Sequence, residues 1–443
     1  MYQAKAPQAK VIADHRLELL NYTVRDLRLG DETKWSDGVL TVNADELKKH
    51  LIAEAGVRRV GIAVARPGEA TRIVNILDAI EPRAKPGDGQ IFPGFLGAMD
   101  GTVGRGQTHA IDGCAVMVCG SVPGEVASQV VSEAMVDMSG PGAEYSPFSR
   151  TMNLVLWCDF YDDQGPVKRV SVARYAGLLA ARFLAQATLD HSPDATRIYE
   201  MPEKALTIQN HTPHVVYICP GMLLSDLHQT FLSGSALTST PTVVHPTQLM
   251  DGILVSGNYD IGATRNPTYF YQRNPIVEAL FAHQQNGLLA FAGVIVSKCL
   301  IEGFFGKQRS AYLAAQTAKL LDADGAVISI EECGHAYADL MLTCQACEEM
   351  GIKTVLLMAE SAGPTGAKPG PIAFAEAADA VISVGNMDEL ISLPAVEAVL
   401  GGPWSCGRWM IDNMALEAME TPLANIFAAT CQLGPGRLTG ETR

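Results

Sequence analysis

Residues 326–360, AVISIEECGHAYADLMLTCQACEEMGIKTVLLMAE, contain the pattern that decides the fold of this chain. The apolar runs AVISI and IKTVLLM predict buried strands, and YADLMLTCQACEEMG between them predicts a helix that ends at Gly351. A strand, a helix and a second strand in this order indicate a parallel pair, because parallel strands need a crossover connection. The stretch therefore predicts a parallel α/β sheet.

The same alternation continues on both sides of this stretch. Directly before it come the strand LLAFAGVIVS and the helix SAYLAAQTAKLLDADG, which we expect to end on Gly325, and after it comes the strand AADAVISVG. Further upstream the order is the strand NLVLWCDFY, the helix RVSVARYAGLLAARFLAQA, the strand HVVYICPG, a polar helix and the strand TVVHP. From residue 153 onward the pattern predicts parallel strands with crossover helices, as in Rossmann-like folds.

The first 150 residues are instead rich in strand-like segments and turns. YTVRDLRLG and GVLTVN flank the turn WSDG at 35–38, a helix is predicted over ADELKKHLIAEAG, and VRRVGIAVA and TRIVNILDAIEP follow as strands. A single core rarely exceeds roughly 250–300 residues, so a chain of 443 residues predicts more than one domain. We expect an α/β protein with a β-rich mixed domain at 1–150 and parallel α/β domains at 151–287 and 288–443.

Composition and charge exclude several classes of protein. The 33 Lys and Arg residues against 48 Asp and Glu residues give a net charge of −15, with no basic cluster, which argues against nucleic acid as a partner. No apolar run reaches the roughly 18 residues of a membrane span, and the first residues do not resemble a signal peptide. The ten cysteines lie in apolar contexts, as buried free thiols do. We therefore expect a cytoplasmic protein that does not enter membranes.

The end of the strand AVISI carries the candidate chemistry. Ligands of parallel sheets bind beyond the carboxyl ends of strands, here the segments after residues 297, 330 and 358. Glu331, Cys333 and His335 follow such a strand, and Cys344 lies on the next helix. A thiol with a base and an orienting carboxylate is a pattern of nucleophilic catalysis. Packing of Cys344 and Cys347 against the sheet explains these two thiols equally well.

Two further interpretations of this region stay open. Cys333, His335, Cys344 and Cys347 would supply a Cys3His zinc set, but one cysteine pair lies within a helix, whereas zinc ribbons hold their ligands on loops. Whether a metal is bound is not determined by the pattern. The glycine-rich loop MAESAGPTGAKPGPIAF after the next strand fits an anion site, a contact to a substrate carboxylate or a lid, and it matches no nucleotide-binding motif.

Seven strings spread over about residues 60–360 resemble one known family. In order, they are ARPGEATRIVNILDAIEPR, GRGQTHAIDGCAVMVCG, DMSGPGAEYSPFSRTMNLV, HPTQLMDGILVSGN, NPTYFYQRNPIVEALF, DGAVISIEE and GIKTVLLMAE. They are similar to the precursor subunit of component B in the glycine, sarcosine and betaine reductases, which is related to the D-proline reductase proprotein. The resemblance implies an α/β fold, a pocket for a small amine- or amide-containing substrate, and docking to a second reductase-type subunit.

The resemblance also implies a cofactor that this chain lacks the means to make. In that family the chain is cut before a cysteine that follows the sequence VSGN, and this cysteine becomes a pyruvoyl group. Here VSGN ends at Asn258 and the next residue is Tyr259. A phenol oxygen lies across a rigid ring from its own backbone and cannot reach the preceding carbonyl. We therefore expect no cleavage and no pyruvoyl cofactor; Ser256 offers a less suitable nucleophile.

The same resemblance implies which residues form the site. It suggests that the substrate lies near His109, His245, Asp251, Asn258 and Tyr259. The resemblance implies that Glu331 and Cys344 occupy motif positions that persist from the family, whereas Cys333 and His335 are particular to this chain.

Three functions remain compatible with these observations. The first is an uncleaved component B-like protein that binds an amine or amide and acts with a second subunit. The second is a non-redox thiol or acid–base enzyme, a hydrolase, lyase or racemase, acting on an amino-acid-derived or cyclic amide substrate. The third is a non-catalytic scaffold of such a complex.

Overall fold

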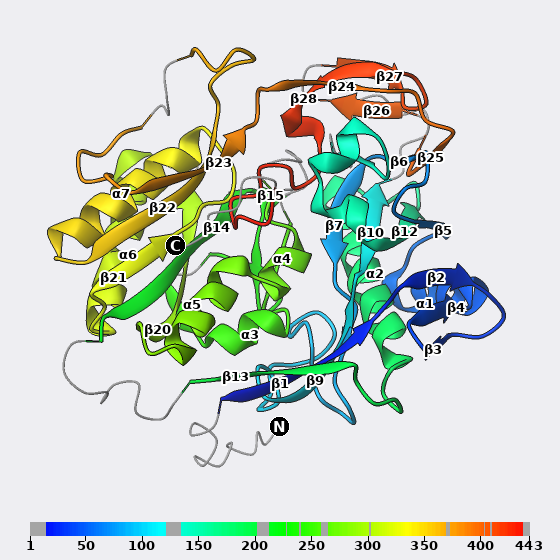
Figure 1. Ribbon diagram of the computed structural model, residues 1–443, viewed down its shortest axis with the longest axis horizontal. Helices are drawn as coiled ribbons and strands as arrows, with labels where there is room; N and C mark the ends of the chain where they lie inside the picture. Colours follow the sequence, from blue (N-terminus) through cyan, green and yellow to red (C-terminus); the bar gives the residue numbers. More distant parts are fainter. Residues whose placement is uncertain are drawn as a thin grey trace.

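The computed structural model describes residues 15–120, 134–201, 212–226, 228–238, 241–257, 265–300, 303–368, 373–402, 404–407 and 410–436. It is an α/β protein, as the sequence predicts, and Figure 1 shows two large parts side by side with α3 and α4 between them. None of the helices in these ranges is both long enough and apolar enough to cross a membrane.

One part is built on a four-stranded sheet in the order β5-β12-β10-β7. Two helices pack against it, α1 and the long α2. The bounds are β5 Arg59–Ala65, β7 Ile76–Ile80, β10 Cys114–Gly120, β12 Met152–Asp159, α1 Ala44–Ala55 and α2 Pro166–Gln186. Asn43 caps α1 through its side chain, and Gly56 ends it in a left-handed conformation (φ 73°), as its sequence predicts. The segment 152–186, which follows the expected domain boundary at residue 150, thus forms strand β12 of this sheet and helix α2, which packs against it.

Two smaller sheets extend this part. The order β13-β1-β9-β8 joins strands from distant positions, and β2, β4 and β3 form a short sheet whose tight turn at Asp37 and Gly38 has positive φ at both residues. The turn predicted from WSDG is confirmed. The bounds are β1 Arg16–Thr23, β2 Asp26–Leu29, β3 Lys34–Ser36, β4 Val39–Val42, β8 Arg83–Ala84, β9 Gly106–Asp112 and β13 Ala195–Glu200.

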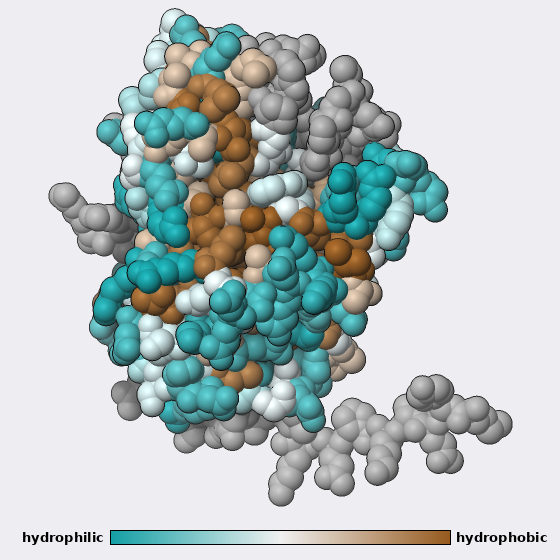
Figure 2. Space-filling view, turned by 90° about the vertical axis from the view of Figure 1, so that its right-hand side faces the viewer, coloured by the Kyte–Doolittle hydropathy of each residue, from teal (hydrophilic) through white to brown (hydrophobic). Residues whose placement is uncertain are grey.

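The outer edge of this part is apolar. β5 lies at the edge of its sheet, and residues 61–64 in it are all partly exposed. Figure 2 shows a band of hydrophobic residues on this side of the molecule, which in Figure 1 carries β2, α1 and β5.

The other part is built on a seven-stranded sheet in the order β18-β20-β14-β21-β22-β23, with β15 paired to β14. Five of its strands, β20, β14, β21, β22 and β23, are parallel neighbours. The bounds are β14 His214–Ser225, β15 His228–Gln229, β18 Thr242–Val244, β20 Ala290–Leu300, β21 Gly325–Ile328, β22 Lys353–Glu360 and β23 Val381–Asn386. β14 precedes residue 287, the expected boundary between the two α/β domains, and β20 follows it, yet the two strands are neighbours in this sheet.

Five helices belong to this part or border it. α6 and α7 lie next to each other and cover one face of the sheet, α5 contacts β20, and α3 and α4 carry the connections from β18. The bounds are α3 Pro246–Met250, α4 Thr268–Gln272, α5 Pro275–Gln285, α6 Phe304–Leu320 and α7 His335–Glu349. As predicted, α7 is followed by Gly351 with a left-handed φ of 78°.

Three local predictions for this part are wrong. The segment after HVVYICPG is not a polar helix, because β14 continues to Ser225 and short strands follow, β15, β16 (Phe231–Leu232) and β17 (Ser235–Ala236). α6 ends at Leu320, with Leu321 as its C-cap, and not on Gly325, which begins β21. β18 pairs antiparallel with β20. In each case pairing with a distant strand outweighs local propensity.

The last part of the chain returns to the first. β25 (Ala398–Leu400) pairs in parallel with β6 (Thr71–Ile73), and β11 (Val136–Asp137) pairs with the other side of β6. Three more pairings complete the fold: β24 (Leu390–Leu393) with β28 (Met419–Pro422), β26 (Trp404–Gly407) with β27 (Met410–Met414), and β16 with β19 (Leu254–Val255). The 3-10 turns are Pro141–Glu144, Pro147–Arg150 and Leu423–Asn425.

Candidate functional site

The strand order of the large sheet defines where a ligand is expected. Numbered along the chain, the five parallel strands have the order 2-1-3-4-5, so the switch point lies between β14 and β21, the first and third of these strands. In sheets of this kind ligands bind at the carboxyl ends of the strands beside this switch point. Glu331 follows β21 at this edge, as its position after AVISI predicts.

Glu331 joins the carboxyl ends of β14 and β21. Its side chain is fully buried, and its Oε2 accepts hydrogen bonds from the Met222 amide at 3.0 Å, the Tyr271 hydroxyl at 3.1 Å and the Thr230 hydroxyl. Oε1 has no partner among the described residues. A buried carboxylate oxygen without a donor is costly, so this atom marks a position for a ligand or an ordered water.

Burial and polar neighbours act in opposite directions on the pKa of Glu331. Desolvation raises the pKa of this carboxyl, while hydrogen bonds from Thr230, Met222 and Tyr271 and the Arg265 cation act in the opposite direction. The backbone beyond it is strained, because Glu332 has a positive φ of 79°. Gln432 donates a 2.7 Å hydrogen bond to the Glu332 carbonyl and so holds this turn.

The segment that resembles the family's cleavage sequence lies next to Glu331. The Gly257 carbonyl accepts from the Gln229 amide at 3.4 Å, and the neighbouring Thr230 is the residue that donates to Glu331. On the far side of the segment, the side-chain amide of Asn266 donates to the Ile330 carbonyl at 3.3 Å. Asn258 and Tyr259 themselves lie outside the described residues. Both ends of the segment are thus placed beside the buried carboxylate.

A second buried carboxylate supports the same segment. Asp78 accepts from the Thr268 amide at 3.0 Å and the Thr268 hydroxyl at 2.6 Å, and the Ser256 amide donates to that hydroxyl at 2.9 Å. Burial raises the pKa of Asp78 to about 6, against the hydrogen bonds and the nearby Arg265. Ser256 Oγ, also fully buried, has no partner in the described ranges. Two successive hydrogen bonds, from Ser256 to Thr268 and from Thr268 to Asp78 on β7, therefore hold the backbone at residue 256.

The predicted thiols and His335 lie on α7 or directly before it. Cys344 is buried in the core between α7 and the sheet, where its Sγ lies 3.2 Å from Thr354 Oγ1 and burial raises its pKa. This environment supports the packing interpretation of Cys344 and, with it, of buried Cys347. Cys333 is half-buried, and His335 is exposed at the start of α7. Nowhere in the described ranges do three His, Cys, Asp or Glu residues gather as a metal would require.

His245 and Asp251 lie in another polar cluster, at the junction of α3 with β9. The His245 ring stacks on His15 with centroids 4.0 Å apart, and Arg105 donates to His15. Asp251 is fully buried and forms an ion pair with Lys85 at 3.0 Å. His109 is buried elsewhere, stacked on Tyr22 and 3.1 Å from the Thr188 hydroxyl, and burial lowers its pKa. None of the described hydrogen bonds or ion pairs joins these three residues to Glu331.

The environment of His245 makes stability depend on pH. Burial, His15 and Arg105 lower the pKa of His245 to about 3, whereas it is about 6.5 in an unfolded chain. As pH falls below 6.5, the unfolded state takes up a proton that the folded state does not, so the free energy of unfolding decreases. We expect His245→Asn, which keeps a side chain suited to cap α3, to reduce the loss between pH 7 and pH 5 by up to about 2 kcal/mol. Urea unfolding of both proteins at the two pH values measures this difference, and equal losses would contradict it.

Comparison with known proteins decides the family. A family model described as glycine/sarcosine/betaine reductase component B subunits matches residues 15–440. This chain belongs to that family. It is 34% identical to the glycine reductase complex component B subunits alpha and beta of Acetoanaerobium sticklandii, covering 96% of this chain and 100% of the relative. The same protein of Peptoclostridium acidaminophilum is 36% identical over 96% of this chain and 99% of its own length.

A relative from another reductase complex has a similar level of identity. The sarcosine reductase complex component B subunit alpha of Peptoclostridium acidaminophilum is 33% identical over 87% of this chain and 89% of the relative. No solved structure matches the chain significantly.

Several residues of the site were missed by reasoning from the sequence. Thr268 and Tyr271 lie in the string NPTYFYQRNPIVEALF, where polar hydroxyls among aromatic residues were the available signal. Asp78 lies in the apolar run NILDAI, where a single carboxylate in a buried strand was the available signal. Thr230 had no such signal, because it lies in the segment predicted as a polar helix.

Proposed function

We propose that this chain is an uncleaved component B-type subunit that binds a small amine-containing substrate at Glu331 and acts with a second subunit. The observation that carries the proposal is the buried Glu331 Oε1, which has no donor within the described ranges. Three donors hold Oε2 and so fix the orientation of the carboxylate, which leaves Oε1 in a fixed position to accept a hydrogen bond. An ammonium or amine N–H supplies the missing donor and stabilises the ionised carboxylate against desolvation.

The requirement for an N–H narrows the substrate class. The named relatives are components of glycine and sarcosine reductase complexes, and the family description also includes betaine reductase. Primary and secondary amines carry the donor that Oε1 needs, whereas a fully methylated nitrogen does not. The geometry therefore favours a glycine-like or sarcosine-like amine over a betaine-like one for this chain.

The residues of this chain do not fit formation of the pyruvoyl group that the family resemblance implies. That group arises from a cysteine after VSGN, and this chain has Tyr259 at that position. The phenol cannot attack the carbonyl that precedes it. We propose that the chain stays uncut and that the substrate is held by hydrogen bonds and charge.

The mass of the purified protein tests this part of the proposal. We expect one species at the 47.3 kDa of the full chain, with no adduct after treatment with hydroxylamine, which traps carbonyl groups. Tyr259→Cys is the matched variant, because it restores the thiol at the same position; cleavage of this variant alone would identify Tyr259 as the residue that prevents processing. Two fragments from the unaltered protein, one carrying an adduct, would overturn the proposal.

A second candidate function is a non-redox acid–base reaction on a similar substrate, and the raised pKa of Glu331 favours it. The two functions differ in what they require for substrate conversion. A component of a reductase complex converts substrate only with a reductant and its partner subunit present, whereas an acid–base enzyme needs neither. Substrate loss measured with and without these additions separates them.

A further inference from the structure

The hydroxyl of Ser256 is a buried hydrogen-bond donor that lacks an acceptor. Ser256 is fully buried, and its Oγ has no hydrogen-bond partner among the described residues. Its backbone is held in place, because its amide donates to Thr268 Oγ1 at 2.9 Å. A buried hydroxyl without a hydrogen bond costs free energy, so it indicates either an unfavourable feature of the fold or one half of a contact with a ligand.

Strand register places Ser256 beside the Glu331 carboxylate. β16 and β19 are antiparallel, and their register places Thr230 opposite Ser256. The Gln229 amide donates to the Gly257 carbonyl one position further along, as this register requires. The side chains of opposite residues lie on the same side of a sheet, with Cβ atoms about 4.5–5.5 Å apart. Because the Thr230 hydroxyl donates to Glu331 Oε2, the Ser256 hydroxyl lies on the side of this carboxylate.

The charged groups around these two side chains balance one another. Arg265 lies close enough to the carboxyls of Glu331 and Asp78 to act on the pKa of both. A Cβ atom added to Gly257 would lie 3.0 Å from the guanidinium of Arg174, which is also buried. These two carboxylates, when ionised, and two guanidinium groups have a net charge of zero. A ligand without net charge therefore enters at a lower electrostatic cost than an ammonium ion alone.

We propose that Ser256 is a second substrate-binding residue, whose Oγ donates a hydrogen bond to the carboxylate of an amino acid bound as a zwitterion. This inference rests on the proposed function, because it takes the substrate nitrogen to lie at Glu331 Oε1. Oε1 needs a donor and Ser256 Oγ needs an acceptor, and the ammonium and carboxylate groups of one amino acid supply both. Methylamine carries the ammonium group of glycine without the carboxylate, so it leaves the hydroxyl unsatisfied.

Ser256→Ala tests this role, with glycine and methylamine as the two ligands in isothermal titration. We expect the unaltered chain to bind glycine at least about tenfold more tightly than methylamine, and Ser256→Ala to bind glycine about tenfold more weakly than the unaltered chain. The urea midpoint of the variant is expected to stay the same or to rise, because the substitution removes a buried hydroxyl that has no partner. A hydroxyl with a purely structural role would instead lower this midpoint when removed.

Ser149→Ala is the matched control. Ser149 is also buried, but its hydroxyl donates to the carbonyls of Ala143 at 2.5 Å and Ser146 at 2.8 Å. We expect this variant to lower the urea midpoint and to keep the glycine affinity within about twofold of the unaltered chain. Loss of affinity without loss of stability is therefore expected only in Ser256→Ala.

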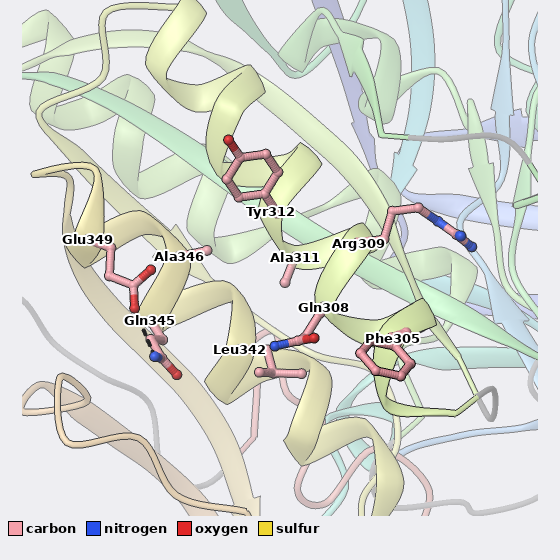
Figure 3. Close-up of a pocket in the computed structure, with 9 residues that line it drawn as sticks. All are labelled: Phe305, Gln308, Arg309, Ala311, Tyr312, Leu342, Gln345, Ala346 and Glu349. Carbon is pink, nitrogen blue, oxygen red and sulfur yellow. Dashed lines mark hydrogen bonds between the residues drawn. The ribbon is translucent and has the colours of Figure 1, made fainter.

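The pocket between α6 and α7 is a second place where an amino acid could bind. It has a volume of about 460 Å³, and Figure 3 shows Glu349 among its lining residues, with Gln345 donating to this carboxylate at 2.8 Å. Glu349 is exposed, so water screens its charge and an ion pair there contributes little. Glu349→Gln is therefore expected to leave the glycine affinity unchanged.

The outcomes separate this inference from the proposed function. If Glu331→Gln weakens glycine binding and Ser256→Ala does not, the role of Ser256 is wrong and the proposed function stands. If Glu349→Gln weakens glycine binding as much as Ser256→Ala does, the amino acid lies elsewhere and the role of Ser256 is again wrong. An unaltered chain that binds neither glycine nor sarcosine overturns both.

Discussion

Replacing Glu331 with glutamine is expected to weaken the binding of glycine or sarcosine about 10- to 100-fold. The Met222 amide can only donate, so the side-chain oxygen of glutamine must take the position of Oε2, and its NH2 group then occupies the position of Oε1. An amine substrate would meet a donor where it needs an acceptor. Isothermal titration of both proteins with each amine measures the difference.

Glu332→Gln is the matched control, because it makes the same chemical change at the neighbouring residue and leaves Oε1 of Glu331 in place. Its binding is expected to stay within about twofold of the unaltered protein. The Glu331→Gln result also distinguishes two substrate classes. A ligand that offers a carbonyl to a protonated Glu331 would bind the glutamine variant as well as before, because the NH2 group still donates. Unchanged amine binding would overturn the assignment of Glu331.

The raised pKa of Glu331 makes the affinity for an amine depend on pH. Below its pKa the buried carboxyl is protonated and its Oε1 is a weaker partner for an ammonium group. Amine affinity should therefore increase as pH rises through the pKa of Glu331, and this increase should be absent in Glu331→Gln.

Replacing Asp137 with alanine is expected to destabilise the fold by about 3–5 kcal/mol. Asp137 and Arg72 are both fully buried, and two hydrogen bonds of 2.5 and 2.9 Å join them. The guanidinium also donates to the carbonyls of Pro394, Ala415 and Glu417, so it ties the returning part of the chain to β6. In Asp137→Ala the charged Arg72 guanidinium stays buried without the carboxylate that pairs with it, and this lowers the free energy of unfolding.

Denaturant unfolding measures the loss, and limited proteolysis shows where it acts, with cleavage expected first in residues 394–417. Lys34→Ala is the control, because the Lys34–Glu32 pair has a similar separation of 2.9 Å but lies on the surface, where such pairs contribute less than about 1 kcal/mol. Replacing both partners with apolar residues, Arg72→Met with Asp137→Leu, should recover part of the loss. Equal stability of Asp137→Ala and Lys34→Ala would contradict this account.

Much of the candidate site could not be predicted, because it is assembled from positions far apart in the chain. The position of Glu331 at a strand end was predicted from the local pattern, and its burial follows from the apolar run before it. Its partners Met222, Thr230 and Tyr271 come from segments 60 to 109 residues away, and no local pattern reports such separations. The resemblance placed His245 and Asp251 beside the cleavage segment, but the structure gives them partners around β9.

The sequence by itself determined the α/β class, the turn at residues 35–38, helices α1 and α7, the parallel strands around AVISI, and the family. These features depend on local periodicity, turn chemistry and recurring strings, which neighbouring residues specify together. Only the tertiary structure decided the strand order, the pairing of β25 with β6, the burial of Cys344, and the position of the Glu331 oxygen that has no hydrogen-bond donor among the described residues. Each of these depends on which distant segments exclude water together, and burial of that kind is a property of the folded chain.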